Sequence, residues 1–141
     1  MPTELIVRAE HQGGLKFAAT AGEHQVTLDY PFPPGHAAEG ATPLEMILAS
    51  LAVCSGSTLA LVLGRMKQPL EGLEVEARGV RSDTHPTVLT EISLDFRLRG
   101  EGLQAEAVQS ALEVAENQLC PVWAMLKPGT AITASFRLAE E

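Results

Sequence analysis

The stretch TPLEMILASLAVCSGSTLALVLGRMK, residues 42–67, decides how the rest of the chain must fold. Thr42 suits a helix N-cap, Pro43 the first helical position and Glu45 the third, so together they predict a capping box. Residues at helical spacing follow, namely Leu44, Ile47, Leu48, Leu51, Ser55, Thr58, Leu59 and Val62. Because Gln68-Pro69 ends this pattern, we expect one long helix that runs to about Lys67.

The centre of this helix is long and apolar enough to be mistaken for a membrane span. Residues 46–63 carry no charge and reach the ~18-residue length of a transmembrane candidate. The polar run from Cys54 to Thr58 would lie in mid-bilayer, where unpaired polar groups are costly. We therefore expect a buried soluble helix and no membrane partner. At ~36 Å it is too long for one six-stranded sheet to cover, which predicts a homodimer.

The flanking segments predict six strands and a second helix. Alternation and turn residues indicate strands near 4–9, 15–19, 25–30, 73–81, 88–99 and 131–138, and a helix over 105–119 that Pro121 bends or ends. The order is βββαββαβ, and clean alternation in 88–99 is typical of an antiparallel sheet with one wet face. We find no repeat or linker, so we expect a single α+β domain over residues 1–141.

Composition excludes some classes of function. The chain has 10 basic and 18 acidic residues and a net charge of −8, whereas nucleic-acid binding requires clustered Lys and Arg. The N-terminus shows no leader pattern, so we expect a cytoplasmic protein. The four histidines, His11, His24, His36 and His85, share no metal-ligand spacing, so we expect no metal site.

The two cysteines carry the most chemistry in the sequence. Cys54 lies in the polar part of the apolar helix, and Cys120 precedes Pro121. By composition alone they are either buried fillers or a redox pair, because free cysteine is often buried and inert. In a reducing compartment they are not expected to form a permanent disulfide. His36 could line a pocket or be a solvated loop residue, and Trp123 could be core or pocket wall.

Two motifs resemble those of the OsmC/Ohr family. Residues 40–54, GATPLEMILASLAVC, look like the family's first-cysteine helix, and Leu119-Cys120-Pro121-Val122 looks like its second-cysteine motif. The resemblance implies a two-layer fold with a mainly antiparallel, six-stranded sheet, two main helices and an intertwined homodimer. It further implies thiol-dependent reduction of organic hydroperoxides, with Cys54 as the attacking and Cys120 as the resolving thiol. An external dithiol would be the reductant, and no cofactor is needed.

The chain departs from the well-studied branches of that family at two positions. Leu44 stands where those branches have a glutamate, and Glu45, one residue later, lies on the helix face opposite Cys54. The stretch Leu15–Ala19 offers Lys16 but no arginine, whereas Arg81 resembles an arginine of the family's less characterised third branch. Glu45 and Arg81 are therefore candidate catalytic residues. Their alternatives are a capping acid and a solvated strand end.

Three functions remain open at this point. The first is a peroxidase for organic hydroperoxides that uses Cys54 and Cys120. The second is a catalytically weak binding protein of the same fold that holds a small apolar ligand. The third is a structural dimer whose cysteines are inert.

Overall fold

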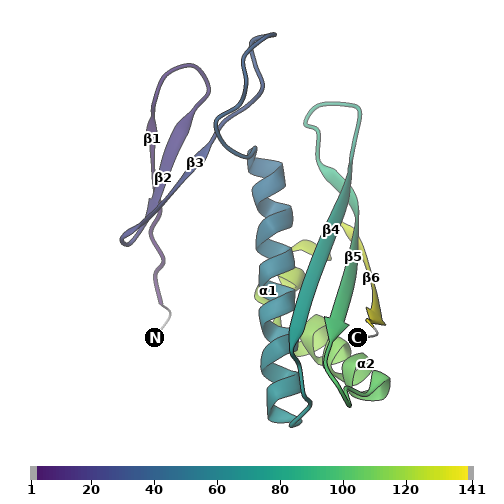
Figure 1. Cartoon of the computed structure of the whole chain (residues 1–141). Helices are drawn as coiled ribbons and strands as arrows, with labels where there is room; N and C mark the ends of the chain where they lie inside the picture. The colour runs from purple at the N-terminus through teal and green to yellow at the C-terminus, as the bar shows by residue number, and fades with distance from the viewer. Residues whose placement is uncertain (1–2, 140–141) are drawn as a thin grey trace. The chain divides into compact units, whose positions relative to one another are not determined.

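The computed structural model describes residues 3–139, and the chain forms two units, residues 1–47 and 48–141. The elements in chain order are β1 Arg8–His11, β2 Phe17–Ala21, β3 His24–Leu28, α1 Pro43–Arg65, β4 Gly72–Arg81, β5 Leu89–Arg99, α2 Ala105–Val114, the π-helix η1 Ala115–Leu119, α3 Pro121–Leu126 and β6 Ala131–Leu138. The α+β class and the order of strands and helices are as predicted. Figure 1 shows these elements along the chain.

The first unit is an antiparallel sheet in the order β1-β2-β3. Several strand ends in this unit lie two to four residues from the predicted bounds. The Gly13-Gly14 and Gly22 turns, all at positive φ, set where strand pairing starts. Cross-strand neighbours divide the sheet into a polar face and an apolar face. The polar face includes Arg8, Thr20 and Gln25, which pair across the strands. The apolar face includes Ala9, Ala19 and Val26.

A buried carboxylate fastens the loop that leads from β3 to α1. Asp29 is 1% exposed and accepts hydrogen bonds from the backbone N–H of Tyr30 (2.7 Å), the backbone N–H of Glu39 (3.0 Å) and Nε2 of His36 (2.9 Å). Its own N–H donates to the Ala41 carbonyl at 3.1 Å. The bonds from Glu39 and His36 favour the charged form and lower the pKa of Asp29 to about 2.

Helix α1 begins with the predicted capping box. The Thr42 N–H donates to the Glu45 carboxylate at 2.8 Å, and the Glu45 N–H donates to the Thr42 hydroxyl at 3.2 Å. The helix has the length and composition to span a membrane, with a mean hydropathy of 2.1, and 28% of that window is buried within the chain. The buried part is one stripe of the helix, which contains Leu51, Ser55, Gly56, Leu59, Val62 and Leu63.

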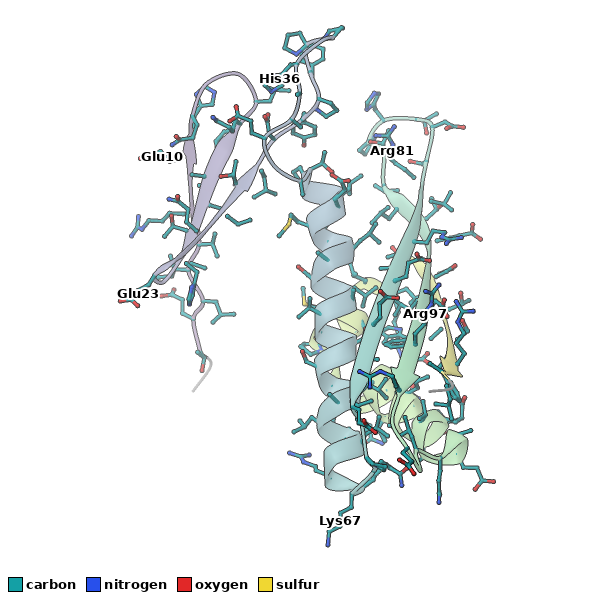
Figure 2. All side chains as sticks on the ribbon, in the orientation of Figure 1. Glu10, Glu23, His36, Lys67, Arg81 and Arg97 are labelled. Carbon is teal, nitrogen blue, oxygen red and sulfur yellow. The ribbon has the colours of Figure 1, made fainter. Side chains whose placement is uncertain are left out.

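The second unit packs this stripe against a sheet in the order β4-β5-β6. The inward residues of β5 are buried, namely Ile92, Leu94, Phe96 and Leu98. Charged residues such as Arg97, labelled in Figure 2, lie on the opposite, solvated face. The helical elements contribute Leu51, Leu59, Val108, Leu112 and Trp123 to the same core. One face of this sheet is therefore buried and the other solvated, as the alternating sequence of β5 predicts.

The expectation of a single six-stranded sheet was wrong, because the six strands of the chain form two three-stranded sheets. Sheet β4-β5-β6 is also mixed, because β5 pairs with β6 in parallel. The physical reason is the connection: α2, η1 and α3 carry the chain back across the sheet before β6 begins. Such a crossover permits a parallel neighbour, whereas a hairpin does not.

The predicted helix 105–119 is divided into two parts. The α-helical hydrogen bonds of α2 end at Val114, and residues 115–119 form a π-helix. Cys120 then adopts an extended backbone, with φ −81° and ψ 105°. Pro121 therefore begins the next helix, α3, and does not merely end the previous one. Proline is favoured there because the first helical N–H has no intrahelical partner to lose.

Asp29 makes the stability of the first unit dependent on pH. Its folded pKa of about 2 lies below the ordinary value of 3.8. Its contribution should therefore be complete above pH ~4 and lost as the pH falls toward 2. We expect Asp29→Asn to lower the free energy of unfolding near pH 6, and the difference from wild type to shrink in acid. Urea unfolding at several pH values, with Asp83→Asn as an exposed-carboxylate control, measures this. A difference that stays constant down to pH ~2 would contradict it.

Candidate functional site

The second unit brings the two cysteines into contact. Both are free thiols, and their sulfur atoms lie 3.0 Å apart. This separation exceeds the ~2.05 Å of a disulfide bond, so the two sulfur atoms are in contact without a covalent bond between them. The two sulfur atoms thus lie close together, as expected, and their reversible disulfide stays a prediction.

Cys54 is placed by the close packing of α1 on β4. Gly56, two residues further along the helix, has no side chain, and a Cβ there would lie 3.0 Å from a Val75 methyl group. At the other end of the contact, a Cβ on Gly79 would meet the Leu48 side chain at 3.1 Å. Glycines on both elements thus allow the helix to approach the strand closely. Cys54 is left partly buried against the core.

Cys120 is placed by the π-helix that precedes it. Its N–H donates to the Ala115 carbonyl at 2.9 Å, five residues back, and its side chain is 2% exposed. Burial, first, and then the neighbouring Cys54 thiol raise the pKa of Cys120 to about 11, against the backbone N–H groups of Trp123 and Val122, which favour its thiolate. Cys120 is thus a protonated thiol at neutral pH.

The polar side chains near Cys54 bond to their own helix. The Thr58 hydroxyl donates to the Cys54 carbonyl at 2.8 Å, and the buried Ser55 hydroxyl donates to the Ala52 carbonyl at 3.3 Å. Such bonds to preceding carbonyls satisfy hydroxyl groups inside a helix. The hydroxyl groups of Ser55 and Thr58 are therefore satisfied within the helix and need no bound ligand.

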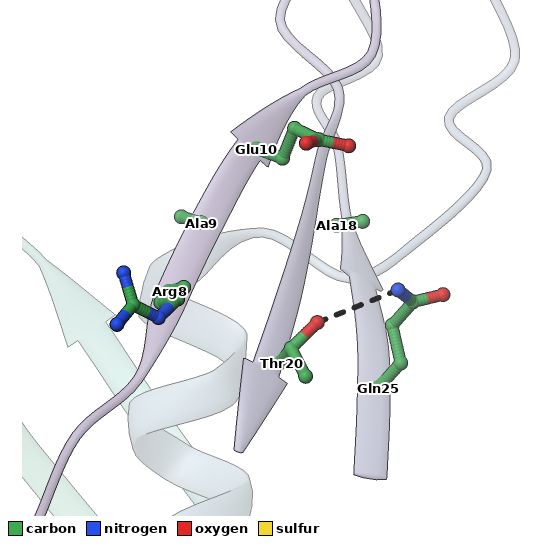
Figure 3. Close-up of a pocket in the computed structure, with 6 residues that line it drawn as sticks. All are labelled: Arg8, Ala9, Glu10, Ala18, Thr20 and Gln25. Atoms are coloured by element: carbon green, nitrogen blue, oxygen red, sulfur yellow. Dashed lines mark hydrogen bonds between the residues drawn. The ribbon is translucent and has the colours of Figure 1, made fainter. Parts of the chain in front are cut away.

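The second unit has two small hollows, of which one is lined by Cys120 and neither by Cys54. One, of about 270 Å³, lies between α1 and β4 and is lined by Ala52, Val53, Gly56, Ser57, Leu73 and Val75. The other, of about 180 Å³, is lined by η1 and the start of α3, including Glu116 and Cys120. A third hollow, of about 590 Å³, lies on the polar face of the first unit's sheet. Figure 3 shows its lining side chains, with a hydrogen bond from Gln25 to Thr20, and it contains neither thiol.

The other candidate residues have partners of their own or lie exposed, and none is bonded to a thiol within residues 3–139. Glu45 is exposed and occupied by the capping box, and the bonds from the Thr42 N–H and hydroxyl lower its pKa. Arg81 is exposed at the end of β4 (Figure 2), and no bond to either thiol is found within residues 3–139. Lys16 forms an ion pair with Glu39 at 3.3 Å. His36 contacts Asp29 and helps to line a hollow of about 210 Å³ in the first unit.

Some features of the site were missed by sequence reasoning. Trp123, for which both roles were open, is core and 1% exposed, and its indole N–H has no acceptor in the described part of the chain. The π-helix has no sequence signature, because Ala115–Leu119 continues the apolar spacing of an ordinary helix. The buried Asp29 could have been suspected from its position between a strand and the proline-rich loop.

A protein-family model matches the chain. The model is described as OsmC-like protein and covers residues 35–135. Protein YhfA of Escherichia coli strain K12 is 29% identical over 127 residues, which cover 89% of this chain and 91% of YhfA.

Solved structures agree with this match. An OsmC-like protein from Mycoplasma pneumoniae has a TM-score of 0.86 at 21% identity and covers 99% of this chain and 100% of its own. An organic hydroperoxide resistance protein OsmC from Legionella pneumophila has a TM-score of 0.70 at 18% identity, with coverages of 95% and 96%. At these identities the structures show a common fold.

The burial of Cys120 predicts an order of thiol labelling. Iodoacetamide reacts with thiolates, so Cys120, with its pKa raised to about 11, should be modified very slowly at pH ~8. We expect Cys54 to be labelled first in the folded protein and both cysteines to be labelled at similar rates in urea. Peptide mass spectrometry over a time course measures both rates. Faster labelling of Cys120 in the folded protein would contradict the prediction.

Proposed function

Because the chain belongs to the OsmC-like protein family, we propose that it is a thiol-dependent peroxidase that reduces organic hydroperoxides with Cys54 and Cys120. The observation that carries the proposal is the 3.0 Å separation of the two sulfur atoms. Some structural relatives are named organic hydroperoxide resistance proteins, among them one from Bacillus subtilis. A family role in redox chemistry is therefore the premise, and the specific activity is our proposal.

The proposed reaction uses the two thiols in turn. The Cys54 thiolate attacks one oxygen of the hydroperoxide; the O–O bond breaks, the alcohol leaves and Cys54 becomes a sulfenic acid. Cys120 then attacks the Cys54 sulfur, water leaves and a disulfide forms. An external dithiol reduces this disulfide and is itself oxidised. The cycle requires two electrons from the dithiol and uses no metal or organic cofactor.

An apolar hollow in the second unit favours an organic substrate. The hollow between α1 and β4, of about 270 Å³, is lined mostly by aliphatic side chains, including Val53 and Val75, but not by Cys54. Burying an alkyl group there is favourable by roughly 25 cal/mol for each Å² removed from water. We propose that the hydroperoxides that this protein reduces carry an apolar organic group.

We also propose that the protein acts as a cytoplasmic homodimer, in which each chain is a single functional domain. In the isolated chain, α1 exposes large apolar side chains, including Val53 (66%) and Leu61 (51%). The N-terminal segment does the same at Leu5 (89%) and Val7 (63%). Monomeric soluble proteins rarely expose such continuous apolar surface, and a second copy would cover it.

We assign different roles to the two weaker candidates. Glu45 is proposed to act mainly as the capping acid of α1, because both of its polar bonds go to Thr42. Arg81 is proposed as a supporting cation, since it is exposed and forms no ion pair with any residue of the range 3–139. It would then be free to meet a substrate or the second copy.

A binding protein for a small apolar ligand is the second candidate. It is favoured by one observation: Leu44 replaces the family's glutamate, and Glu45 is engaged in the cap. Native mass spectrometry of protein purified without detergent would detect a copurified ligand. A bound ligand together with no turnover of cumene hydroperoxide and dithiothreitol would favour this function over the peroxidase.

The peroxidase proposal predicts unequal effects of two substitutions. Cys54→Ser should abolish reduction of cumene hydroperoxide by dithiothreitol, because the attacking thiolate is gone. Glu45→Gln should retain most of the rate and lower stability by at most about 1 kcal/mol, because its amide oxygen can still accept the capping bond. Steady-state assays at matched folded fraction measure both.

Two results would contradict these assignments. Full activity of Cys54→Ser would remove Cys54 as the nucleophile. A roughly hundredfold loss in Glu45→Gln would show acid–base participation, which is the size of effect such groups produce. Glu45 would then reach a cysteine of the second copy, because it cannot reach its own.

The dimer proposal predicts a surface substitution that separates the copies. Leu61→Glu, at a position half exposed in the single chain, should dissociate the dimer while leaving each chain folded. Glu91→Lys, on the solvated face of β5, is the control and should remain dimeric. Sedimentation equilibrium at micromolar concentration distinguishes the two, and an interface above ~2,000 Å² is expected. A monomeric wild type would refute the proposal.

A further inference from the structure

We propose that Cys120 has a role before it resolves the sulfenic acid: its S–H group donates a hydrogen bond to the Cys54 sulfur and stabilises the Cys54 thiolate. Cys120 would thus be a positioning and activating residue as well as the second nucleophile. The inference rests on the proposed peroxidase function, which requires Cys54 to react as a thiolate.

The need for such a donor follows from the surroundings of Cys54. No charged residue lies on α1 between residues 46 and 63. The inward side chains of β4, Leu73, Val75 and Ala77, are apolar, and so are the buried side chains of β5. A thiolate needs a nearby positive charge or hydrogen-bond donor, and no cation comes from these elements.

The titratable side chain that lines the hollow next to Cys120 carries a negative charge, which cannot stabilise a thiolate. Glu116 of η1 lines the hollow next to Cys120 and would disfavour a thiolate. Helix α3, Pro121–Leu126, has no charged residue, and the α2 residues that pack into the core are apolar. Within the described residues of the second unit, the group that touches the Cys54 sulfur is therefore the Cys120 thiol, at 3.0 Å.

Cys120 is suited to remain the donor. Burial disfavours its thiolate and raises its pKa to about 11, so its proton is retained at neutral pH. The backbone N–H groups of Trp123 and Val122 favour negative charge on the Cys120 sulfur, which polarises its S–H bond. The geometric contact is the one between the two sulfur atoms, 3.0 Å apart.

The same proton completes the second step. Once Cys54 is a sulfenic acid, the Cys120 sulfur forms the S–S bond and the S–O bond of Cys54 breaks. The Cys120 proton goes to the departing hydroxide, and water is released. The two N–H groups that polarised the thiol then stabilise the negative charge that develops on Cys120. No additional acid, base or oxidant is needed.

The test compares two substitutions that differ only in whether a donor is present. Cys120→Ser keeps a hydroxyl that can donate to Cys54, whereas Cys120→Ala removes it. We expect the rate of Cys54 alkylation by iodoacetamide at pH ~7 to fall about tenfold in Cys120→Ala and to stay within about twofold of wild type in Cys120→Ser. The pH midpoint of alkylation should move upward in the alanine variant alone.

Equal alkylation rates in wild type and Cys120→Ala would overturn the inference, as would a Cys120→Ser variant as slow as Cys120→Ala. Circular dichroism confirms that the variants are folded. If either is unfolded, Cys54→Ala provides the reciprocal test: without its acceptor, Cys120 should be alkylated several times faster at pH ~9, and an unchanged rate would refute the coupling. These readouts need no peroxide, so they fail or succeed independently of the peroxidase proposal.

Discussion

The packing of α1 onto β4 and β5 is the contact on which the rest of the second unit depends. It buries Leu51, Leu59 and Leu63 against the inward side chains of β5, and each such side chain contributes roughly 1.5–3 kcal/mol by leaving water. Glycine at positions 56 and 79 allows helix and strand to approach. Because Cys54 lies within this contact, the core that stabilises the fold also fixes the position of one reactive sulfur.

The partner thiol is fixed by a different device. The π-helix Ala115–Leu119 and the extended backbone of Cys120 end one helix and let Pro121 begin another. Single π-helical turns are uncommon in proteins, and those that occur are often found at functional sites. Here the break places Cys120 directly before a helix N-terminus, where the N–H groups of Val122 and Trp123 favour negative charge on its sulfur.

The surroundings of the thiols are apolar, and the described residues of the second unit, 48–139, place no cation against them. A charged activating group beside Cys54 would have to be desolvated in this core, at a cost of several kcal/mol unless well paired. A neutral S–H donor avoids that cost, although it is a weaker donor than a guanidinium group. Large apolar side chains are also exposed on α1 and near the N-terminus, and a second copy of the chain would bury them.

The sequence by itself determined the elements whose signals are local. The capping box of Thr42 and Glu45, the alternation in β5 and the proline stops depend on neighbouring residues, so the order of strands and helices and the α+β class could be predicted. Only the tertiary structure decided what depends on distant residues: that the sulfurs of Cys54 and Cys120, 66 positions apart, meet at 3.0 Å, that β6 joins β5 in parallel, and that Asp29 is buried. Periodicity shows which face of an element is apolar but not which element covers it, because many pairings satisfy the same pattern.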